Sequence, residues 1–373
     1  MSSSKTIELP QLDDFRSIFL NDTPLLDVRA PVEFTQGAFP HTENVPLMND
    51  NEREEVGICY KKLGQDEAIQ LGHKLVQGEI KSERVDHWAD FFQQHPEGIL
   101  YCFRGGMRSR ISQQWIYEKT GIVYPRVKGG YKAMRRFLID ELETSSQRIK
   151  PVILGGRTGI GKTVFLQKIE KKIDLEGMFH HRGSVFGKHV TAQPTQIDIE
   201  NALSIELMKQ LQQQHNHIVL EDEGANIGSR QIPECLFETM KDSPIVLLDA
   251  SIEERINITF DEYISEDLAE HQAYYGEGQG FEQWAQQLHD SFDKIQRRLG
   301  GVRYKELKAL LTTAIEQHKS GNTESHKKWI EVLLVDYYDP MYDYQLSKKQ
   351  DRVVFKGNRS EALEYLASEY QIS

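Results

Sequence analysis

The chain has 373 residues, of which 39% are hydrophobic and 27% are charged, a composition typical of a globular protein with two or three domains. Its formal net charge of −12 argues against a nonspecific nucleic-acid binder, although a local basic face remains compatible with it. The three cysteines, Cys59, Cys102 and Cys235, are far apart and form no CxxC pair, which argues against a zinc site and a disulfide framework.

Two further absences in the sequence concern location. Residues 1–5 contain no apolar stretch of the kind that opens a signal peptide. No run approaches the roughly 20 apolar residues that a membrane span needs. Unpaired cysteines fit a reducing compartment. We therefore expect a cytoplasmic protein without a membrane segment.

The first domain is expected over residues 1–145. Short apolar runs predict strands and longer amphipathic runs predict helices. The predicted strands are 24–28, 98–102 and 122–124, and the predicted helices are about 67–76, 85–94 and 108–119. Alternating strands and helices indicate a parallel sheet covered by helices. The polar stretch 143–147 marks the expected boundary.

The second domain is expected over residues 146–373 and has the same α/β character. The predicted strands are 151–154, 217–221, 244–249 and 331–336. Long helical patterns cover 197–214 and much of 252–319. The order of these elements predicts an α/β domain with a helical insertion.

Cys102 ends the second predicted strand and opens the loop Cys102-Phe103-Arg104-Gly105-Gly106-Met107-Arg108. The glycines allow several backbone N–H groups to point at one anion, and the arginines add positive charge, which together stabilise a thiolate. Cys102, Arg104 and Arg108 are therefore the predicted catalytic residues. Arg108 stands six positions after Cys102, a spacing shared with cysteine phosphatases, so spacing alone leaves sulfur transfer and phosphatase chemistry open.

The cysteine loop resembles that of rhodanese (sulfurtransferase) domains. Three further segments, 26–34, 37–47 and 127–131, are similar to motifs of the same family. The resemblance implies a rhodanese-like parallel sheet for the first domain. Many rhodanese loops place the arginine one position earlier, and residues 57–90 exceed what a minimal rhodanese domain needs.

Residues 156–163 match the complete Walker A pattern Gly-x4-Gly-Lys-Thr, and they lie between a predicted strand and a predicted helix. In this motif backbone amides cradle phosphate oxygens, and the lysine reaches the terminal phosphates. The predicted phosphate-binding residues are Gly156, Arg157, Thr158, Gly159, Gly161, Lys162 and Thr163. The second domain is therefore expected to be P-loop NTPase-like.

The acidic partner of the P-loop departs from the usual pattern. The strand at 217–221 runs into Glu221-Asp222-Glu223 rather than ending in a single Asp. Thr163 and Asp222 are the predicted Mg²⁺ ligands, with Glu221 as an alternative to Asp222. This shift argues against ordinary ATP hydrolysis.

The fusion of both modules resembles the tRNA 2-selenouridine synthase family, which carries the strings found here at 101–106 and 155–159. The resemblance covers nearly the whole chain. It implies that 2-thiouridine at wobble position U34 of tRNA-Lys, tRNA-Glu and tRNA-Gln becomes 2-selenouridine. It also implies selenophosphate and geranyl diphosphate as co-substrates, an S-geranyl-2-thiouridine intermediate, and no tightly bound cofactor. We expect a monomer.

In that chemistry Cys102 would carry selenium as a Cys–S–Se⁻ adduct, and the P-loop would hold the diphosphate of the prenyl donor. The candidate tRNA-binding residues are Arg135, Arg136, Arg182 and Lys188. Two other functions stay open. A nucleotide-dependent tRNA sulfurtransferase using a Cys102 persulfide would require ATP or GTP. A regulatory phosphate-binding adaptor would not need Cys102 and Lys162, and their presence argues against it.

Overall fold

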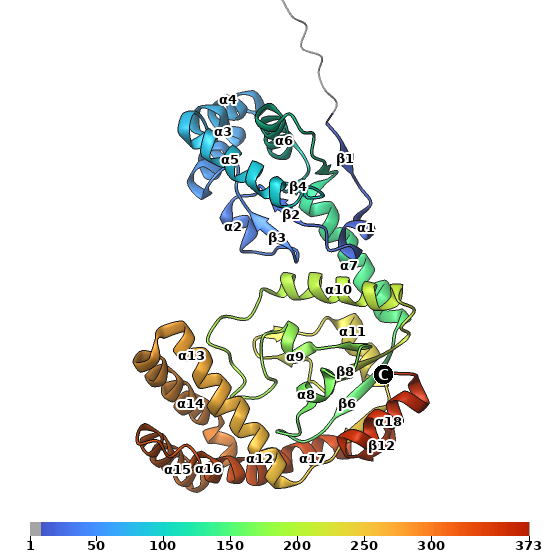
Figure 1. The fold of residues 1–373 in the computed structure, drawn as a ribbon, viewed down its shortest axis with the longest axis vertical. Helices are drawn as coiled ribbons and strands as arrows, with labels where there is room; N and C mark the ends of the chain where they lie inside the picture. Colours follow the sequence, from blue (N-terminus) through green and yellow to red (C-terminus); the bar gives the residue numbers. More distant parts are fainter. Residues whose placement is uncertain (1–8, 373) are drawn as a thin grey trace, which may run out of the picture. The chain divides into compact units, whose positions relative to one another are not determined.

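The computed structural model describes residues 9–372 and divides into two compact units, each coloured along the chain in Figure 1. Unit 1 contains the chain up to residue 144 together with 195–209, and unit 2 contains 145–194 and the chain from 210 onward. The expectation about residues 1–5 lies outside the described part. Both units are α/β with parallel sheets, as the sequence predicts.

Unit 1 is built on a five-stranded parallel sheet of order β1-β5-β4-β2-β3. Its strands are β1 (Gln11–Leu12), β2 (Leu25–Asp27), β3 (Thr42–Asn44), β4 (Ile99–Tyr101) and β5 (Arg126–Val127). Its helices are α1 (Phe15–Leu20), α2 (Pro31–Phe34), α3 (Asp50–Leu63), α4 (Gln65–Leu75), α5 (Gly78–Gln94), α6 (Met107–Thr120) and α7 (Gly130–Arg148). The central strand β4 pairs with β2 so that Ile99 lies opposite Leu25.

Both faces of this sheet are buried, because alternate strand residues enter two different hydrophobic clusters. Leu26 and Leu100 pack with side chains of α5 and α6 on one face. Leu25 and Ile99 pack with side chains of α1 and α7 on the other. Two-sided burial explains why these strands read as short continuous apolar runs.

Most of helix α10 (Gln196–Gln212) belongs to unit 1, although the chain up to residue 194 and from residue 210 onward belongs to unit 2. Its Ser204 hydroxyl donates to the carbonyl of Leu138 on α7 at 2.8 Å. Ile205 and Met208 enter the cluster on that face of the sheet. The helix predicted at 197–214 therefore exists but supports the cysteine-bearing unit.

Unit 2 has a second five-stranded parallel sheet, of order β12-β11-β6-β8-β7. Its strands are β6 (Lys150–Gly155), β7 (Lys172–Ile173), β8 (His217–Glu221), β11 (Ile245–Leu248) and β12 (Val353–Gly357), with a separate hairpin of β9 (Asn226–Ile227) and β10 (Arg230–Gln231). Helices α8 (Lys162–Leu166), α9 (Leu175–Met178), α11 (Glu234–Lys241) and α18 (Arg359–Tyr370) accompany it.

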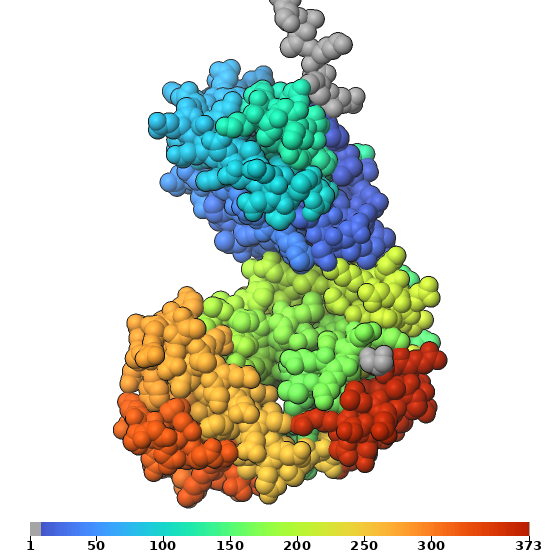
Figure 2. All heavy atoms as spheres, viewed as in Figure 1, coloured from blue at the N-terminus to red at the C-terminus, as the bar shows by residue number. Residues whose placement is uncertain are grey.

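A helical insertion separates β11 from β12. It consists of α12 (Ile252–Phe260), α13 (Asp267–Tyr275), α14 (Glu277–Leu299), α15 (Gly301–Lys319), α16 (His326–Leu333) and α17 (Asp339–Ser347), with π-helical turns at Asp261–Glu266 and Leu334–Tyr338. The insertion has its own core around the buried Trp284 and Trp329. Figure 2 shows most of it in gold to orange, beside the green atoms of the sheet region of unit 2.

The strand predicted at 331–336 is wrong, because this segment is the end of α16 and a π-helical turn. Ile330, Leu333, Leu334 and Tyr337 are buried at helical spacing in the core of the insertion. The periodicity of a short apolar run cannot distinguish a strand from a buried helix. Here the segment is helical because it packs among the other helices of the insertion.

The strand predicted at 122–124 is also wrong, and the strand β5 begins only after Pro125. Ile122 and Val123 are exposed, so this apolar pair is not part of the core. The polar stretch 143–147 lies within α7 rather than in a loop. Among residues 9–372, none of the helices is both long enough and apolar enough to cross a membrane.

Candidate active site: the cysteine loop and the P-loop

Cys102 directly follows β4, and α6 begins five residues later. Its side chain is 3% exposed, and its Sγ lies 3.2 Å from the hydroxyl oxygen of Ser109 on α6. Ser109 in turn donates to the carbonyl of Gly106 at 3.2 Å. The thiol is therefore held at the base of the loop, between the strand and the first turn of the helix.

The segment 127–131 closes over this loop. The amide of Tyr131 donates to the carbonyl of Cys102 at 2.9 Å, and the amide of Lys132 donates to the carbonyl of Phe103 at 3.0 Å. A Cβ on Gly130 would lie 2.1 Å from the carbonyl oxygen of Cys102, and one on Gly105 would lie 2.7 Å from the amide nitrogen of Gly129. Gly105 and Gly130 also have positive φ angles of 62° and 60°, so glycine is required at both positions.

The two predicted arginines of the loop have different environments. Arg108 forms a two-bond ion pair with Glu33. Burial lowers the pKa of Arg108, but this ion pair outweighs it and leaves the pKa raised. Arg104 is exposed at the mouth of the loop, with its guanidinium 5.8 Å from the ring of Phe103. Arg108 is thus positioned by Glu33, whereas Arg104 is accessible to a ligand.

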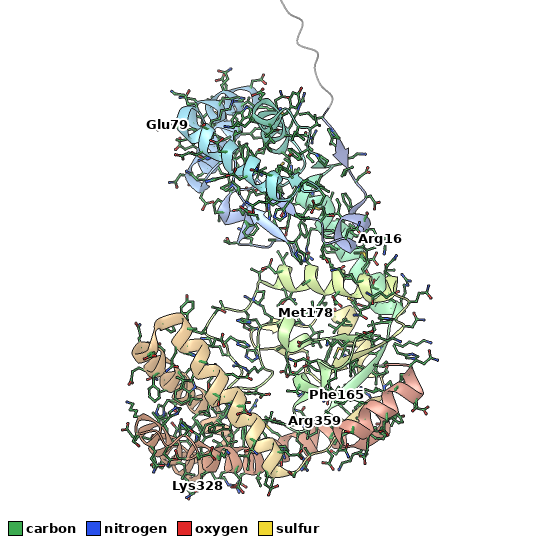
Figure 3. All side chains as sticks on the ribbon, viewed as in Figure 1. Arg16, Glu79, Phe165, Met178, Lys328 and Arg359 are labelled. Atoms are coloured by element: carbon green, nitrogen blue, oxygen red, sulfur yellow. The ribbon has the colours of Figure 1, made fainter. Side chains whose placement is uncertain are left out.

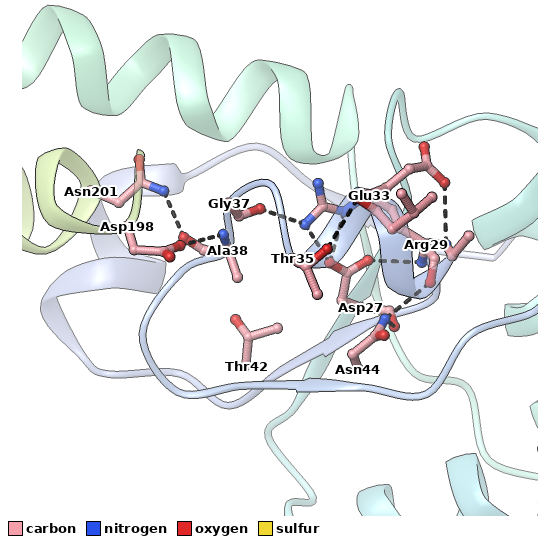
Figure 4. Close-up of polar contacts among 12 residues, drawn as sticks. Asp27, Arg29, Glu33, Thr35, Gly37, Ala38, Thr42, Asn44, Asp198 and Asn201 are labelled. Carbon is pink, nitrogen blue, oxygen red and sulfur yellow. Dashed lines mark hydrogen bonds and ion pairs between the residues drawn. The ribbon is translucent and has the colours of Figure 1, made fainter. Parts of the chain in front are cut away.

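Asp27 and Arg29 form a buried polar network that also includes the carbonyl of Gly37 (Figure 4). Arg29 donates from Nε to Asp27 at 2.7 Å and from Nη2 to the carbonyl of Gly37 at 2.9 Å. Its guanidinium also lies 3.9 Å from the ring of Tyr131, so it links β2 to the segment that closes the cysteine loop. Burial raises the pKa of Asp27 despite the neighbouring arginine.

The P-loop of unit 2 connects β6 to α8 and lines a polar cavity of about 290 Å³. Gly156, Gly159 and Gly161 have positive φ angles, which lets the backbone wrap around the cavity. A Cβ on Gly159 would lie 2.4 Å from the hydroxyl of Thr259 on α12, so the insertion packs directly against this turn. Of the predicted set, Gly156, Thr158, Gly159, Gly161, Lys162 and Thr163 line the cavity.

Three arginines fix the P-loop from outside the cavity. Arg255 donates to the carbonyl of Thr158 at 3.0 Å and pairs with Asp339 at 2.9 and 2.6 Å. Arg359 of α18, labelled in Figure 3, donates to the carbonyl of Ile160 at 2.8 Å. The predicted phosphate ligand Arg157 instead forms an ion pair with Asp343 at 2.7 and 3.0 Å. It does not line the cavity in this arrangement.

Lys162 lies among carboxylates. Its Nζ is 3.9 Å from Glu176, and burial is outweighed by Glu176, Glu223 and Glu221, which leave the pKa of Lys162 raised. Burial and neighbouring carboxylates raise the pKa of Glu221 to about 8 and that of Glu262 to about 7. The pKa of Glu223 is raised well above its usual range for the same reasons. Part of this acidic cluster is therefore protonated at neutral pH, which reduces repulsion of an anion near Lys162.

The predicted Mg²⁺ ligands Thr163 and Asp222 line the same cavity. Asp222, however, accepts a hydrogen bond from Lys349 at 2.6 Å, so its negative charge is neutralised by a lysine. Glu221 is fully buried and accepts the amide of Glu176, and its Oε1 has no hydrogen-bond partner. This donor set does not fit a preformed Mg²⁺ site, and no step below depends on a metal.

Within residues 9–372, one trio of side chains has the spacing of metal ligands: His180, His189 and Glu270. His189 already shares a hydrogen bond of 2.9 Å with Glu270. Glu270 also pairs with Arg182 at 3.5 Å. An arginine at the same carboxylate opposes cation binding, and the observed hydrogen bonds account for the trio.

The four candidate tRNA-binding residues are not equally available. Arg135 contacts Glu200 and Asn201 on α10, and Arg182 contacts Asp267 and Glu270 on α13. Arg136 is exposed, and within residues 9–372 its ion pair is with Asp140, one helical turn away on α7. Lys188 is exposed in the loop before α10. Arg136 and Lys188 are therefore the better placed of the four for phosphate contacts.

Sequence reasoning did not identify two features of these sites. The first is the acidic cluster, because Glu176 and Glu262 are far from the P-loop in sequence. The second is an apolar cavity beside the cysteine loop, lined in part by α3 and α4. The extra length of residues 57–90 was the available signal for the second feature.

A family model and full-length relatives that this chain resembles carry the same family name. The family model described as "tRNA 2-selenouridine synthase AAA domain" matches residues 149–372. Proteins named tRNA 2-selenouridine synthase include one from Sulfurovum sp. (strain NBC37-1), 49% identical over 98% of this chain and 100% of its own length. Another, from Marinobacter nauticus, is 51% identical over 96% of this chain and 98% of its own.

One solved structure shows a weaker likeness. It is described as the N-terminal domain of a putative ATP/GTP binding protein from Clostridium difficile 630. It is 31% identical and covers 31% of this chain and 89% of its own, with a TM-score of 0.28. That score is too low to support an argument about fold.

Proposed function

The chain belongs to the tRNA 2-selenouridine synthase family, and on that premise we propose that it is a tRNA-modifying transferase that converts wobble 2-thiouridine to 2-selenouridine. The observation that carries the proposal is the identity of about 50% with relatives of that name over nearly the full length of both chains. We further propose a rhodanese-like role for unit 1 and an order of two steps.

In the first step the sulfur of 2-thiouridine attacks the first carbon of geranyl diphosphate. The carbon–oxygen bond breaks, diphosphate leaves, and N3 of the base loses its proton to give neutral S-geranyl-2-thiouridine. The P-loop cavity suits the diphosphate because Lys162 provides a positive charge for the leaving group. Partial protonation of the nearby glutamates reduces repulsion of that anion.

In the second step selenium from selenophosphate replaces the geranylated sulfur. A C2–Se bond forms, the C2–S bond breaks, and geranylthiol takes the proton. Hydrolysis of the P–Se bond releases phosphate, so selenium keeps its oxidation state. We assign this step to Cys102 and its loop, with Arg104 available to the anionic donor. Forming a Cys–S–Se⁻ carrier from selenophosphate would need a two-electron oxidant, which this step does not supply, so selenium stays at the selenide level throughout. Dithiothreitol in the assay keeps the Cys102 thiol reduced.

The test is mass spectrometry of nucleosides from tRNA bearing 2-thiouridine at U34, incubated with the full chain and dithiothreitol. Geranyl diphosphate alone should give S-geranyl-2-thiouridine, and addition of selenophosphate should give 2-selenouridine. Neither product should need a nucleotide. A strict requirement for ATP or GTP, or 2-selenouridine formed without any prenyl donor, would contradict the proposed order. The first result would favour the nucleotide-dependent sulfurtransferase.

A further inference from the structure

An apolar cavity of about 490 Å³ opens beside the cysteine loop within unit 1. Its walls come from α3, α4 and α6, and include Val56, Ile69, Val76, Ile111 and Trp115. Its volume lies in the range of about 300–1,000 Å³ that small-molecule sites occupy. The cavity therefore has the size and the lining of a site for an apolar ligand.

The cavity borders the loop that carries Cys102. Arg104, Gly106, Met107 and Arg108 of the cysteine loop form one of its walls. Cys102 itself packs in the hydrophobic cluster that contains Val76 and Trp115. A ligand bound here would therefore lie against the loop that carries the thiol, and not at a remote surface.

The charge of the lining selects the chemical class of the ligand. No aspartate, glutamate or lysine lines the cavity, and Arg108 is neutralised by Glu33. Arg104 lies at the loop side, where a phosphate or selenophosphate group is expected. An uncharged hydrocarbon chain bound next to a separate anionic donor fits this distribution, because the chain buries apolar surface and the arginine meets the donor.

We propose that this cavity, the prenyl cavity, binds the ten-carbon geranyl chain of S-geranyl-2-thiouridine tRNA during the step at Cys102. The inference rests on the proposed function and names the part of the substrate that the second step recognises. Binding the leaving group away from the reacting carbon orients C2 toward the cysteine loop. It also directs the thiol to prenylated tRNA in preference to the unmodified 2-thiouridine.

Two glycines on neighbouring helices provide a matched test. A Cβ on Gly72 of α4, which lines the cavity, would meet only Val56, at 3.9 Å. A Cβ on Gly57 of α3, which does not line it, would meet nothing within 4 Å. Gly72→Leu therefore fills the cavity and Gly57→Leu does not. Both replacements favour helix, so both variants should keep the melting temperature of the parent chain or exceed it.

Binding is read from tryptophan fluorescence of the full chain titrated with S-geranyl-2-thiouridine nucleoside. Trp88, Trp284 and Trp329 are fully buried, whereas Trp115 lines the cavity, so a change in emission reports on this site. The dissociation constant should rise about tenfold or more in Gly72→Leu and stay at the parent value in Gly57→Leu. S-methyl-2-thiouridine should bind weakly to all three proteins.

Catalysis is read from single-turnover conversion of previously geranylated tRNA to 2-selenouridine. Gly72→Leu should slow it about tenfold or more, whereas Gly57→Leu should leave it unchanged. Equal behaviour of both variants, or equal binding of the methyl and geranyl nucleosides, would overturn the assignment. Light scattering would show whether the chain self-associates. If the emission change disappears only under conditions in which it does, a second copy of the chain occupies the cavity, and the prenyl assignment is wrong.

The two proposals fail separately. If the parent chain does not geranylate tRNA from geranyl diphosphate, the two-step function is wrong, while the nucleoside titration still decides whether the cavity binds a prenyl chain. If geranylation and selenation both occur but Gly72→Leu behaves as the parent chain does, only the prenyl cavity is wrong.

Discussion

Gly130 lies so close to Cys102 that a Cβ on the glycine would sit 2.1 Å from the cysteine carbonyl oxygen. The backbone at Gly130 is also left-handed, with φ of 60°. The conformation of the cysteine loop therefore depends on the absence of a side chain nearly thirty residues away in the sequence.

Gly130→Ala should consequently displace the cysteine loop. The positive φ alone costs about 1–3 kcal/mol, and the clash with the carbonyl adds to it. We expect a lower melting temperature and a loss of selenation. Gly57→Ala is the control for stability, because Gly57 lies in helix α3 and a Cβ there meets nothing within 4 Å. An unchanged melting temperature and unchanged selenation in Gly130→Ala would show that the loop tolerates the displacement.

Cys102→Ala should abolish 2-selenouridine and leave geranyl transfer intact, because only the second step is assigned to the thiol. Geranylated tRNA should then accumulate, which mass spectrometry of nucleosides detects. Cys235→Ala is the matched control, since Cys235 lies in unit 2 on α11. Selenation by Cys102→Ala at the parent rate would remove Cys102 from the mechanism.

Lys162→Ala should impair geranyl transfer first. Loss of one charged hydrogen bond costs about 1.5–3 kcal/mol, which corresponds to roughly a 10- to 150-fold decrease in kcat/KM for geranyl diphosphate. Lys168→Ala, at an exposed lysine outside the cavity, should have no effect. Conversion of previously geranylated tRNA should persist in both variants. Normal geranyl transfer by Lys162→Ala would refute diphosphate binding at the P-loop.

The affinity for the prenyl donor should decrease as pH rises through about 7 to 8. The pKa values of Glu262 and Glu221 are raised to about 7 and about 8, so both carboxyls are neutral below that range and ionise within it. Ionisation adds negative charge beside the diphosphate and weakens its binding. Glu262→Gln should flatten the dependence, measured as KM for geranyl diphosphate from pH 6 to 9. Identical pH profiles of KM for variant and parent would exclude Glu262 as the source.

Binding of tRNA should weaken steeply with salt despite the net charge of −12, because phosphate contacts release counterions. Arg136→Ala should reduce the slope of log affinity against log salt concentration by about 1, the value expected for the loss of one phosphate contact. Its surface pair with Asp140 contributes little to stability, so the fold should be unaffected. A flat salt dependence in the parent chain would exclude an electrostatic tRNA interface. An unchanged slope in Arg136→Ala would exclude this residue from it.

Local patterns in the sequence determined the loops and most of the strands that carry them. The Walker A spacing needs only a strand, glycines and a lysine within eight residues, and β6 and α8 flank it as predicted. The Cys102 loop likewise lies between β4 and α6. These features are readable because the interactions that define them are close in sequence. The apolar run 331–336 was misread because its burial depends on helices distant in the chain.

Tertiary structure alone decided the surroundings of both loops. Glu176 and Glu262 line the same cavity as Lys162, one from α9 and the other from the insertion. The raised pKa of Glu262 depends on burial, which no spacing in the sequence encodes. Lys349 pairs with Asp222, the predicted Mg²⁺ ligand, from 127 residues away in the sequence, a contact that no local pattern indicates. The prenyl cavity exists because α3 and α4 pack beside the cysteine loop and leave space between their apolar faces. Contacts between residues distant in the sequence determine the charge around each site, the burial of its side chains and the volume of its cavity. These quantities exist only in the folded chain.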